Sequence, residues 1–126
     1  ERMHPLLMKV PGVDNDAICA LAQQTSQPLI VLSAYLNEIK TLAAAAPNLY
    51  FDIAFAETLN TMQNLTEAVP PERLLFSSHS PFFYPEAAMG KIAQWQADGD
   101  ARDGVAGGNL MRLLRTYPYC SHQLSD

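Results

Sequence analysis

Three polar residues that can do chemistry stand at or near the ends of three apolar runs in the sequence. Ser33 follows the first run, Asp52 lies within the second, and His79 comes shortly after the third. A histidine side chain ordinarily has a pKa of about 6.5, so it can exchange a proton near neutral pH. We therefore predict His79 and Asp52 as catalytic residues, with Ser33 as a residue that binds the substrate.

Further candidates for substrate binding lie close to these positions in the sequence: Tyr35, Ser78 and Tyr84. The aromatic residues 82–84 can form the wall of a substrate pocket, and packing of the same side chains in the core is an equally good interpretation. Ser78 beside His79 does not predict a serine hydrolase, because a Gly-x-Ser-x-Gly turn is absent. Neighbours along a strand also point to opposite faces.

The two predicted catalytic residues also have an interpretation without catalysis. A carboxylate buried in an aromatic strand must be paired or protonated, so Asp52 can serve the fold alone by binding a backbone amide or a hydroxyl. His79 can likewise be a strand-end histidine whose ring nitrogens bind nearby hydroxyl or backbone groups. Both interpretations remain open from the sequence.

Short apolar runs that alternate with helical patterns must position these residues. Residues 29–32 form a continuous branched run, which is typical of a strand buried on both faces, and residues 49–54 and 74–76 are also predicted strands. Another short strand is predicted within residues 3–10. Because the connections are too long for hairpins, we expect parallel pairing through right-handed crossovers.

Parallel pairing determines where the site lies. Ligands of parallel sheets and barrels bind beyond the carboxyl ends of the strands. Ser33, Asp52 and His79 should therefore converge at one edge, and His4 joins them if the opening segment is a strand.

Helices are predicted between and after these strands. Asn37 is a candidate N-cap of one helix, and Pro85 fits the first position of another. A third helix covers about residues 57–69 and ends at two prolines. Residues 97–108 form a polar, glycine-rich segment, after which Asn109 is expected to cap a last short helix.

Three stretches together resemble a known family. Residues 47–53 read PNLYFDI, residues 72–81 read ERLLFSSHSP, and residues 107–114 read GGNLMRLL. In this order they resemble the seventh strand, the eighth strand and the closing helix of the metal-dependent hydrolases of the amidohydrolase-2 type. These enzymes are (β/α)8 barrels that include hydrolases and nonoxidative decarboxylases. The order and the spacing of the three stretches match as well.

The resemblance implies an α/β fold, namely the carboxyl-terminal half of a (β/α)8 TIM-type barrel in which parallel strands alternate with helices. It also implies an amidohydrolase-like hydrolase, or a nonoxidative decarboxylase, that acts on a small organic molecule at the carboxyl ends of the barrel strands. The chemistry of the family uses a divalent ion such as zinc or manganese, which lowers the pKa of its bound water to about 7.

The set of metal ligands that the resemblance implies is incomplete in this sequence. The family uses a His-x-His pair on the first strand, histidines on the fifth and sixth strands, and an aspartate at the end of the eighth. The first strand is absent here, Ser33 and Ala34 stand at the end of the sixth, and His79 replaces the aspartate. His79 is one candidate ligand where about three are needed. A site with one zinc or manganese ion and a site without metal are both compatible with the sequence.

The length of the chain raises the question of what completes the barrel. A barrel of this kind needs roughly 250 residues, and the chain has 126. An open half-barrel exposes a sheet edge and a core face, so we expect a part of a longer protein, or a homodimer formed through this open seam. The alternative function is a non-catalytic barrel fragment that binds a ligand or associates with itself or a partner.

Composition excludes several other classes of protein. The content of 48% hydrophobic and 17% charged residues predicts a single globular domain over residues 1–126, with a flexible tail at residues 116–126. A net charge of −5 indicates no nucleic-acid or membrane partner, and no apolar run could span a bilayer. Two cysteines without a spaced pattern suit a reducing compartment and predict a cytoplasmic protein.

Overall fold

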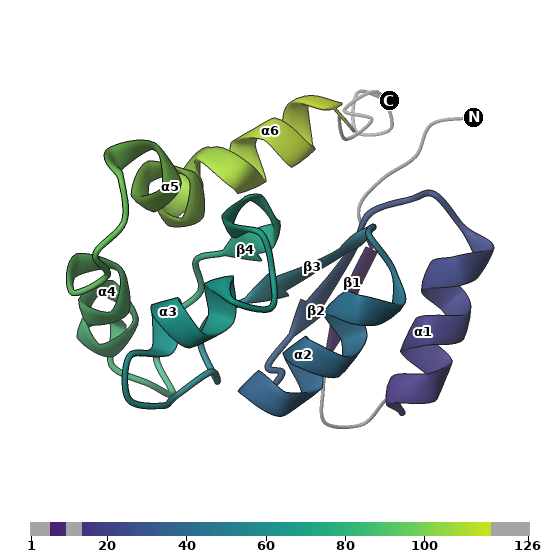
Figure 1. The fold of residues 1–126 in the computed structure, drawn as a ribbon, viewed down its shortest axis with the longest axis horizontal. Helices are drawn as coiled ribbons and strands as arrows, with labels where there is room; N and C mark the ends of the chain where they lie inside the picture. The colour runs from purple at the N-terminus through teal and green to yellow at the C-terminus, as the bar shows by residue number, and fades with distance from the viewer. Residues whose placement is uncertain (1–5, 10–13, 117–126) are drawn as a thin grey trace, which may run out of the picture.

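Four strands form one parallel sheet (Figure 1). The computed structural model describes residues 6–9 and 14–116. The strands are β1 (Leu6–Lys9), β2 (Leu29–Leu32), β3 (Leu49–Asp52) and β4 (Leu74–Leu75). They lie in the order β1-β2-β3-β4, and each neighbouring pair is parallel. The parallel pairing predicted from the apolar runs is confirmed.

Helices alternate with the strands, so the fold is α/β as predicted. The helices are α1 (Asn15–Gln24), α2 (Leu36–Ala45), α3 (Thr61–Thr66), α4 (Pro85–Ala93), α5 (Gly99–Asp103) and α6 (Asn109–Thr116). A 3-10 turn, η1 (Pro71–Arg73), precedes β4, and a π-helical turn, η2 (Gly104–Gly108), joins α5 to α6. Each of α1, α2 and α3 lies in the connection between two successive strands, which is the arrangement of repeated βα units.

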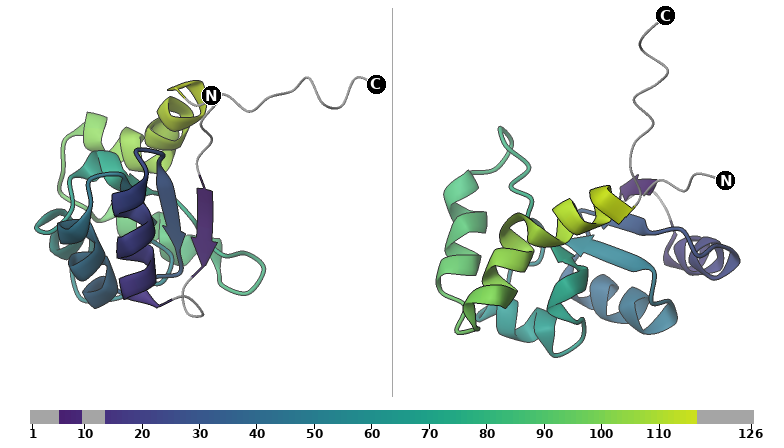
Figure 2. Two further views of the ribbon diagram at one scale, coloured as in Figure 1. Left: turned by 90° about the vertical axis from the view of Figure 1, so that its right-hand side faces the viewer. Right: turned by 90° about the horizontal axis from the view of Figure 1, so that it is seen from above.

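The two faces of the sheet have different neighbours. Phe51 and Leu74 are fully buried in the main core with residues of α1, α2 and α3, and Figure 2 shows α1 and α2 together on one side of the sheet. Leu75 belongs to a smaller cluster, where it packs with Leu113 of α6. Because side chains alternate along a strand, Asp52 lies on the face opposite Phe51. Asp52 therefore points away from the helices of the main core.

Two of the predicted helix boundaries were wrong. The N-cap of α2 is Tyr35, whose backbone N–H donates to the carboxylate of Glu38 at 2.9 Å, whereas Asn37 lies inside the helix. The helix expected over residues 57–69 is limited to Thr61–Thr66. The prediction that α4 begins at Pro85 is confirmed.

The polar, glycine-rich segment at residues 97–108 is helical from Gly99 onward, because α5 and η2 together cover residues 99–108. Asp98 caps α5, because its carboxylate accepts a hydrogen bond from the backbone N–H of Ala101 at 2.8 Å. Val105 in η2 is buried in the main core. Glycines and charged residues in this segment of the sequence concealed the cap at Asp98 and the burial of Val105.

Asn109 supports the fold, as predicted, although it does not cap a helix, because η2 runs directly into α6. Its buried side chain donates hydrogen bonds to the backbone oxygens of Pro71 and Leu74, each at 2.8 Å. These bonds join the first turn of α6 to β4.

We expect Asn109→Ala to lower the free energy of unfolding by about 2 kcal/mol, because two carbonyl groups lose their partner and one of the bonds is buried. The exposed Asn37→Ala is the matched control. Urea unfolding followed by circular dichroism measures both. Equal midpoints for the two variants would contradict the role assigned to Asn109.

Two predictions fall on residues outside the described part of the chain, namely the one for His4 and, beyond Thr116, the tail predicted at residues 116–126. Cys120, the second of the two cysteines, also lies outside it. Cys19, on α1, has a free thiol. In residues 6–9 and 14–116, no helix has both the length and the apolar composition needed to cross a membrane.

Candidate functional site

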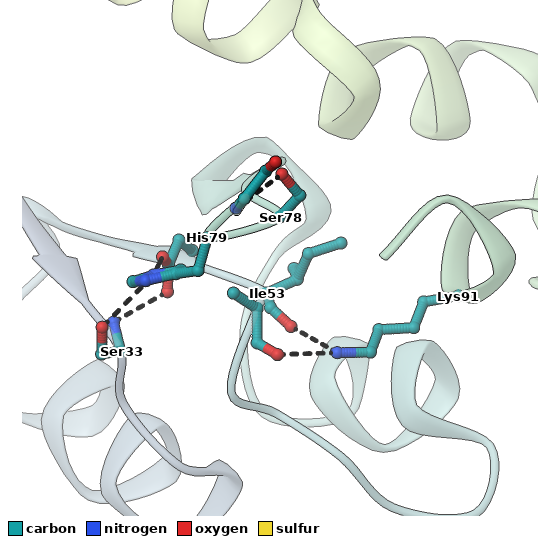
Figure 3. Close-up of polar contacts among 8 residues, drawn as sticks. Ser33, Ile53, Ser78, His79 and Lys91 are labelled. Carbon is teal, nitrogen blue, oxygen red and sulfur yellow. Dashed lines mark hydrogen bonds and ion pairs between the residues drawn. The ribbon is translucent and has the colours of Figure 1, made fainter. Parts of the chain in front are cut away.

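Ser33, Asp52 and His79 meet beyond the carboxyl ends of β2, β3 and β4, and Figure 3 shows Ser33 and His79 pointing toward each other. The backbone N–H of Ser33 donates to Oδ1 of Asp52 at 3.0 Å, and Nε2 of His79 lies 3.0 Å from Oδ2 of Asp52. The same nitrogen lies 3.2 Å from Oγ of Ser33. The convergence expected from parallel strands is confirmed, while the catalytic and binding roles of these residues stay predictions.

The local backbone brings these groups together just beyond the sheet. Asp52 is the last residue of β3 and pairs in register with Leu75 of β4. Ser33 and His79 follow their strands in the left-handed conformation, with φ of 63° and 52°. This conformation costs a non-glycine residue roughly 1 kcal/mol or more, so the hydrogen bonds of the site offset local backbone strain.

Asp52 holds His79 in one orientation. The carboxylate is 1% exposed, and each of its oxygens has a hydrogen-bond partner. A carboxylate only accepts, so Nε2 of a neutral His79 ring carries the hydrogen and Nδ1 keeps its lone pair. The hydrogen bond to a backbone amide that was considered for Asp52 is therefore present, from Ser33 N–H to Oδ1. The other oxygen of Asp52, Oδ2, contacts His79.

Ser33 does not complete a Ser-His-Asp relay. In such a relay the serine and the aspartate bind opposite nitrogens of the ring, whereas here both lie against Nε2. Ser33 is also fully buried, so its hydroxyl is not placed to attack a substrate. In this conformation Ser33 supports Asp52 through its backbone N–H.

Two aromatic rings, those of Phe55 and Phe83, lie beside His79 and also line a cleft that His79 itself does not line. The centroid of Phe55 lies 5.0 Å from that of His79, with the rings nearly perpendicular, and Phe83 lies 5.0 Å from Phe55. An open cleft of about 480 Å³ is lined by Phe55, Phe83 and also by Tyr35 and Tyr84. Tyr84 is 84% exposed and Tyr35 55% exposed. These side chains are available to a ligand and do not form the core.

Ser78, the remaining residue predicted to bind substrate, does not line this cleft. Its hydroxyl accepts a hydrogen bond from the backbone N–H of Ser80 at 3.3 Å, within the turn that follows β4. Its role in substrate binding stays a prediction.

The residues present do not by themselves make a metal centre. Within the described ranges, no three histidine, cysteine, aspartate or glutamate side chains come together in a way that could hold an ion. Asp52 and His79 are a pair, and about three protein ligands are needed for a catalytic zinc ion. A zinc or manganese site would therefore need ligands that these residues do not supply.

Lys91 of α4 was not predicted from the sequence as part of the site. The Nζ of Lys91 donates to the backbone oxygens of Ile53 and Ala54, at 3.0 and 2.9 Å, directly after Asp52 in the chain (Figure 3). Burial lowers the pKa of Lys91, and the charges of Glu57 and Asp52 partly oppose this effect. The only signal in the sequence is a basic residue in the last turn of a helix.

Comparisons with known proteins give similar structures and no similar sequence. No family model and no curated protein matches the chain. The structure is similar to 2,6-dihydroxybenzoate decarboxylase complexed with 2,6-dihydroxybenzoate and to 2,6-dihydroxybenzoate decarboxylase from Rhizobium. For each of these the TM-score is 0.56 and the identity 14%, over 71% of this chain and 35% of the other.

A third similar structure is 5-carboxyvanillate decarboxylase LigW from Sphingomonas paucimobilis. The TM-score is 0.54 and the identity 16%, over 70% of this chain and 33% of the other. The chain thus matches about a third of the length of these enzymes. The fold corresponds to part of a TIM-type barrel. The barrel implied by the resemblance in sequence is confirmed at the level of fold.

Proposed function

We propose that this chain carries the proton-transfer residues of a small-molecule enzyme of the amidohydrolase type, either a hydrolase or a nonoxidative decarboxylase. His79 is the acid and base, and Asp52 orients it. The observation that carries the proposal is the contact between Nε2 and Asp52, which leaves Nδ1 without a hydrogen bond to any other described residue. A positioned imidazole of this kind is suited to general acid–base catalysis.

The same histidine can serve either reaction. In decarboxylation, the bond from a ring carbon to the carboxylate breaks and carbon dioxide leaves. The electron pair of the broken bond stays on the ring carbon, which then takes a proton from protonated His79. In hydrolysis, Nδ1 of neutral His79 takes a proton from the attacking water and later returns it to the leaving group. Decarboxylation is the favoured reaction, because the similar structures are those of decarboxylases.

The aromatic cleft supports a ring-shaped substrate. Phe55 and Phe83 pack edge-on against each other at a centroid distance of 5.0 Å, and a planar substrate ring can pack against the parts of these rings that line the cleft. A cleft of about 480 Å³ is in the size range of small-molecule sites. The expected partner is thus a small aromatic molecule. A cytoplasmic location also stays a prediction.

We expect Phe55→Ala to weaken the binding of 2,6-dihydroxybenzoate to the full chain by about tenfold, because one aromatic contact contributes about 1 kcal/mol beyond its buried area. Isothermal titration calorimetry measures the affinity, and the loss of ultraviolet absorbance of the benzoate reports decarboxylation. Met111→Ala, an exposed apolar change on α6, is the matched control. Equal affinities for the two variants would place the ligand elsewhere.

The alternative function, a non-catalytic fragment that associates with a second copy, rests on a different observation. Leu110, Met111 and Leu114 of α6 are partly exposed, and β1 and β4 are the edge strands of the described sheet. An exposed apolar face beside an open edge favours association. Ligand binding without turnover, together with a dimeric mass in sedimentation, would favour this alternative.

A further inference from the structure

Two buried carbonyl groups lie just past the end of β3. The strand ends at Asp52, and the last contact to β4 is the hydrogen bond from Ile53 N–H to the oxygen of Leu75, at 3.1 Å. Beyond this point the ladder does not supply partners for the oxygens of Ile53 and Ala54, and both residues are buried. Carbonyl groups in such a position need another donor.

Lys91 is that donor. Its Nζ is 3.0 Å from the oxygen of Ile53 and 2.9 Å from that of Ala54, and its side chain is 11% exposed. The ion pair to Glu57 is longer, at 3.6 Å, and Glu57 is 68% exposed, so this pair contributes little. The main partners of the ammonium group are therefore the two carbonyls.

The span held by Lys91 lies between two of the residues that contact His79, namely Asp52 and Phe55. Asp52, on one side of the span, accepts the hydrogen bond from Nε2, and Phe55, on the other side, packs edge-on against the ring. A shift of Ile53 and Ala54 would move both contacts together. No other described residue joins α4 to this segment by a side-chain hydrogen bond that reaches both carbonyls.

We infer that Lys91 is a positioning residue for the His79 site: by binding the carbonyls of Ile53 and Ala54, it fixes Asp52 and Phe55 against the imidazole. This inference rests on the proposed function, in which the orientation of His79 matters. It adds a specific link from α4 to the site. Lys91 touches neither His79 nor the aromatic cleft, so it acts through the backbone of Ile53 and Ala54, just after β3.

The test follows the hydrogen on Nε2 of His79 in the full chain by nuclear magnetic resonance. We expect Lys91→Met, which keeps the length of the side chain and removes its donors, to raise the exchange rate of this hydrogen with water by about tenfold. Lys91→Arg keeps charged donors and should restore slow exchange. Lys40→Met, an exposed change on α2, is the matched control and should leave the rate unaltered.

Unchanged exchange at His79 in a folded Lys91→Met variant would overturn the inference, because a residue that only stabilises α4 would not affect the histidine. If Lys91→Met does not fold, Lys91→Gln takes its place with the same two outcomes, because its amide nitrogen is one atom short of the position of Nζ and carries no charge. The readout is a hydrogen bond and not turnover. An inactive chain with a responsive His79 would thus overturn the proposed function and leave the role of Lys91 supported.

Discussion

Replacing Asp52 with asparagine is expected to reverse the tautomer of His79 and to lower turnover by about a thousandfold. The new side chain would still accept the backbone N–H of Ser33 through its oxygen, so its amide nitrogen would face Nε2. An amide nitrogen donates, and Nε2 would then have to accept. The hydrogen moves to Nδ1, which loses the lone pair that takes the proton in the proposed hydrolysis. In the proposed decarboxylation, protonated His79 loses the carboxylate that stabilises its charge.

Two measurements check this result. An assay of the full chain for the proposed decarboxylation, with 2,6-dihydroxybenzoate as the substrate, measures the loss in kcat, and nitrogen chemical shifts of the imidazole give the tautomer. Asp16→Asn, an exposed change in the first turn of α1, is the matched control. An unchanged tautomer in Asp52→Asn would mean that Asp52 does not set the state of His79.

The largest effect on stability is expected for Phe51→Ala, at about 4 kcal/mol. Phe51 is fully buried in the main core and is flanked by the guanidinium group of Arg73, 5.9 Å from its ring centre. Its removal leaves a cavity between β3 and the helices that cover it. Because Asp52 is the next residue, the same strand carries both the core and the site.

Chemical unfolding in urea, compared with Leu59→Ala at a highly exposed position, measures this loss. Truncating a buried phenylalanine costs at least about 3 kcal/mol. A loss of unfolding free energy below about 1 kcal/mol for Phe51→Ala would therefore indicate that the side chain of Phe51 does not face the main core. In that case Asp52 would not lie on the face assigned to it.

The parts of this fold that depend on apolar periodicity could be predicted. The branched run at 29–32 indicated a strand buried on both faces, and β2 is such a strand. Once the strands were taken as parallel, the edge at which Ser33, Asp52 and His79 meet followed from the geometry of parallel sheets. The strand propensity and the spacing of apolar residues are local properties of the sequence, and they are enough to predict these strands and their shared edge.

Features that depend on contacts between distant residues could not be predicted in the same way. Lys91 lies 38 residues from Ile53, and its position in a helix says nothing about carbonyls at the end of a strand. The helix at residues 99–103 depends on a cap at Asp98 and on burial of Val105, which local glycines and charges obscured. The precise partner of each oxygen of Asp52 likewise required the packed structure.

The tautomer of His79 in the unaltered chain tests the central claim most directly. Correlation of the ring carbon protons with the two ring nitrogens, at a pH where the imidazole is neutral, identifies the nitrogen that carries hydrogen. Contact with a carboxylate at 3.0 Å predicts hydrogen on Nε2. Hydrogen on Nδ1, or rapid averaging between the two nitrogens, would contradict the arrangement of Asp52 and His79 on which the proposed chemistry depends.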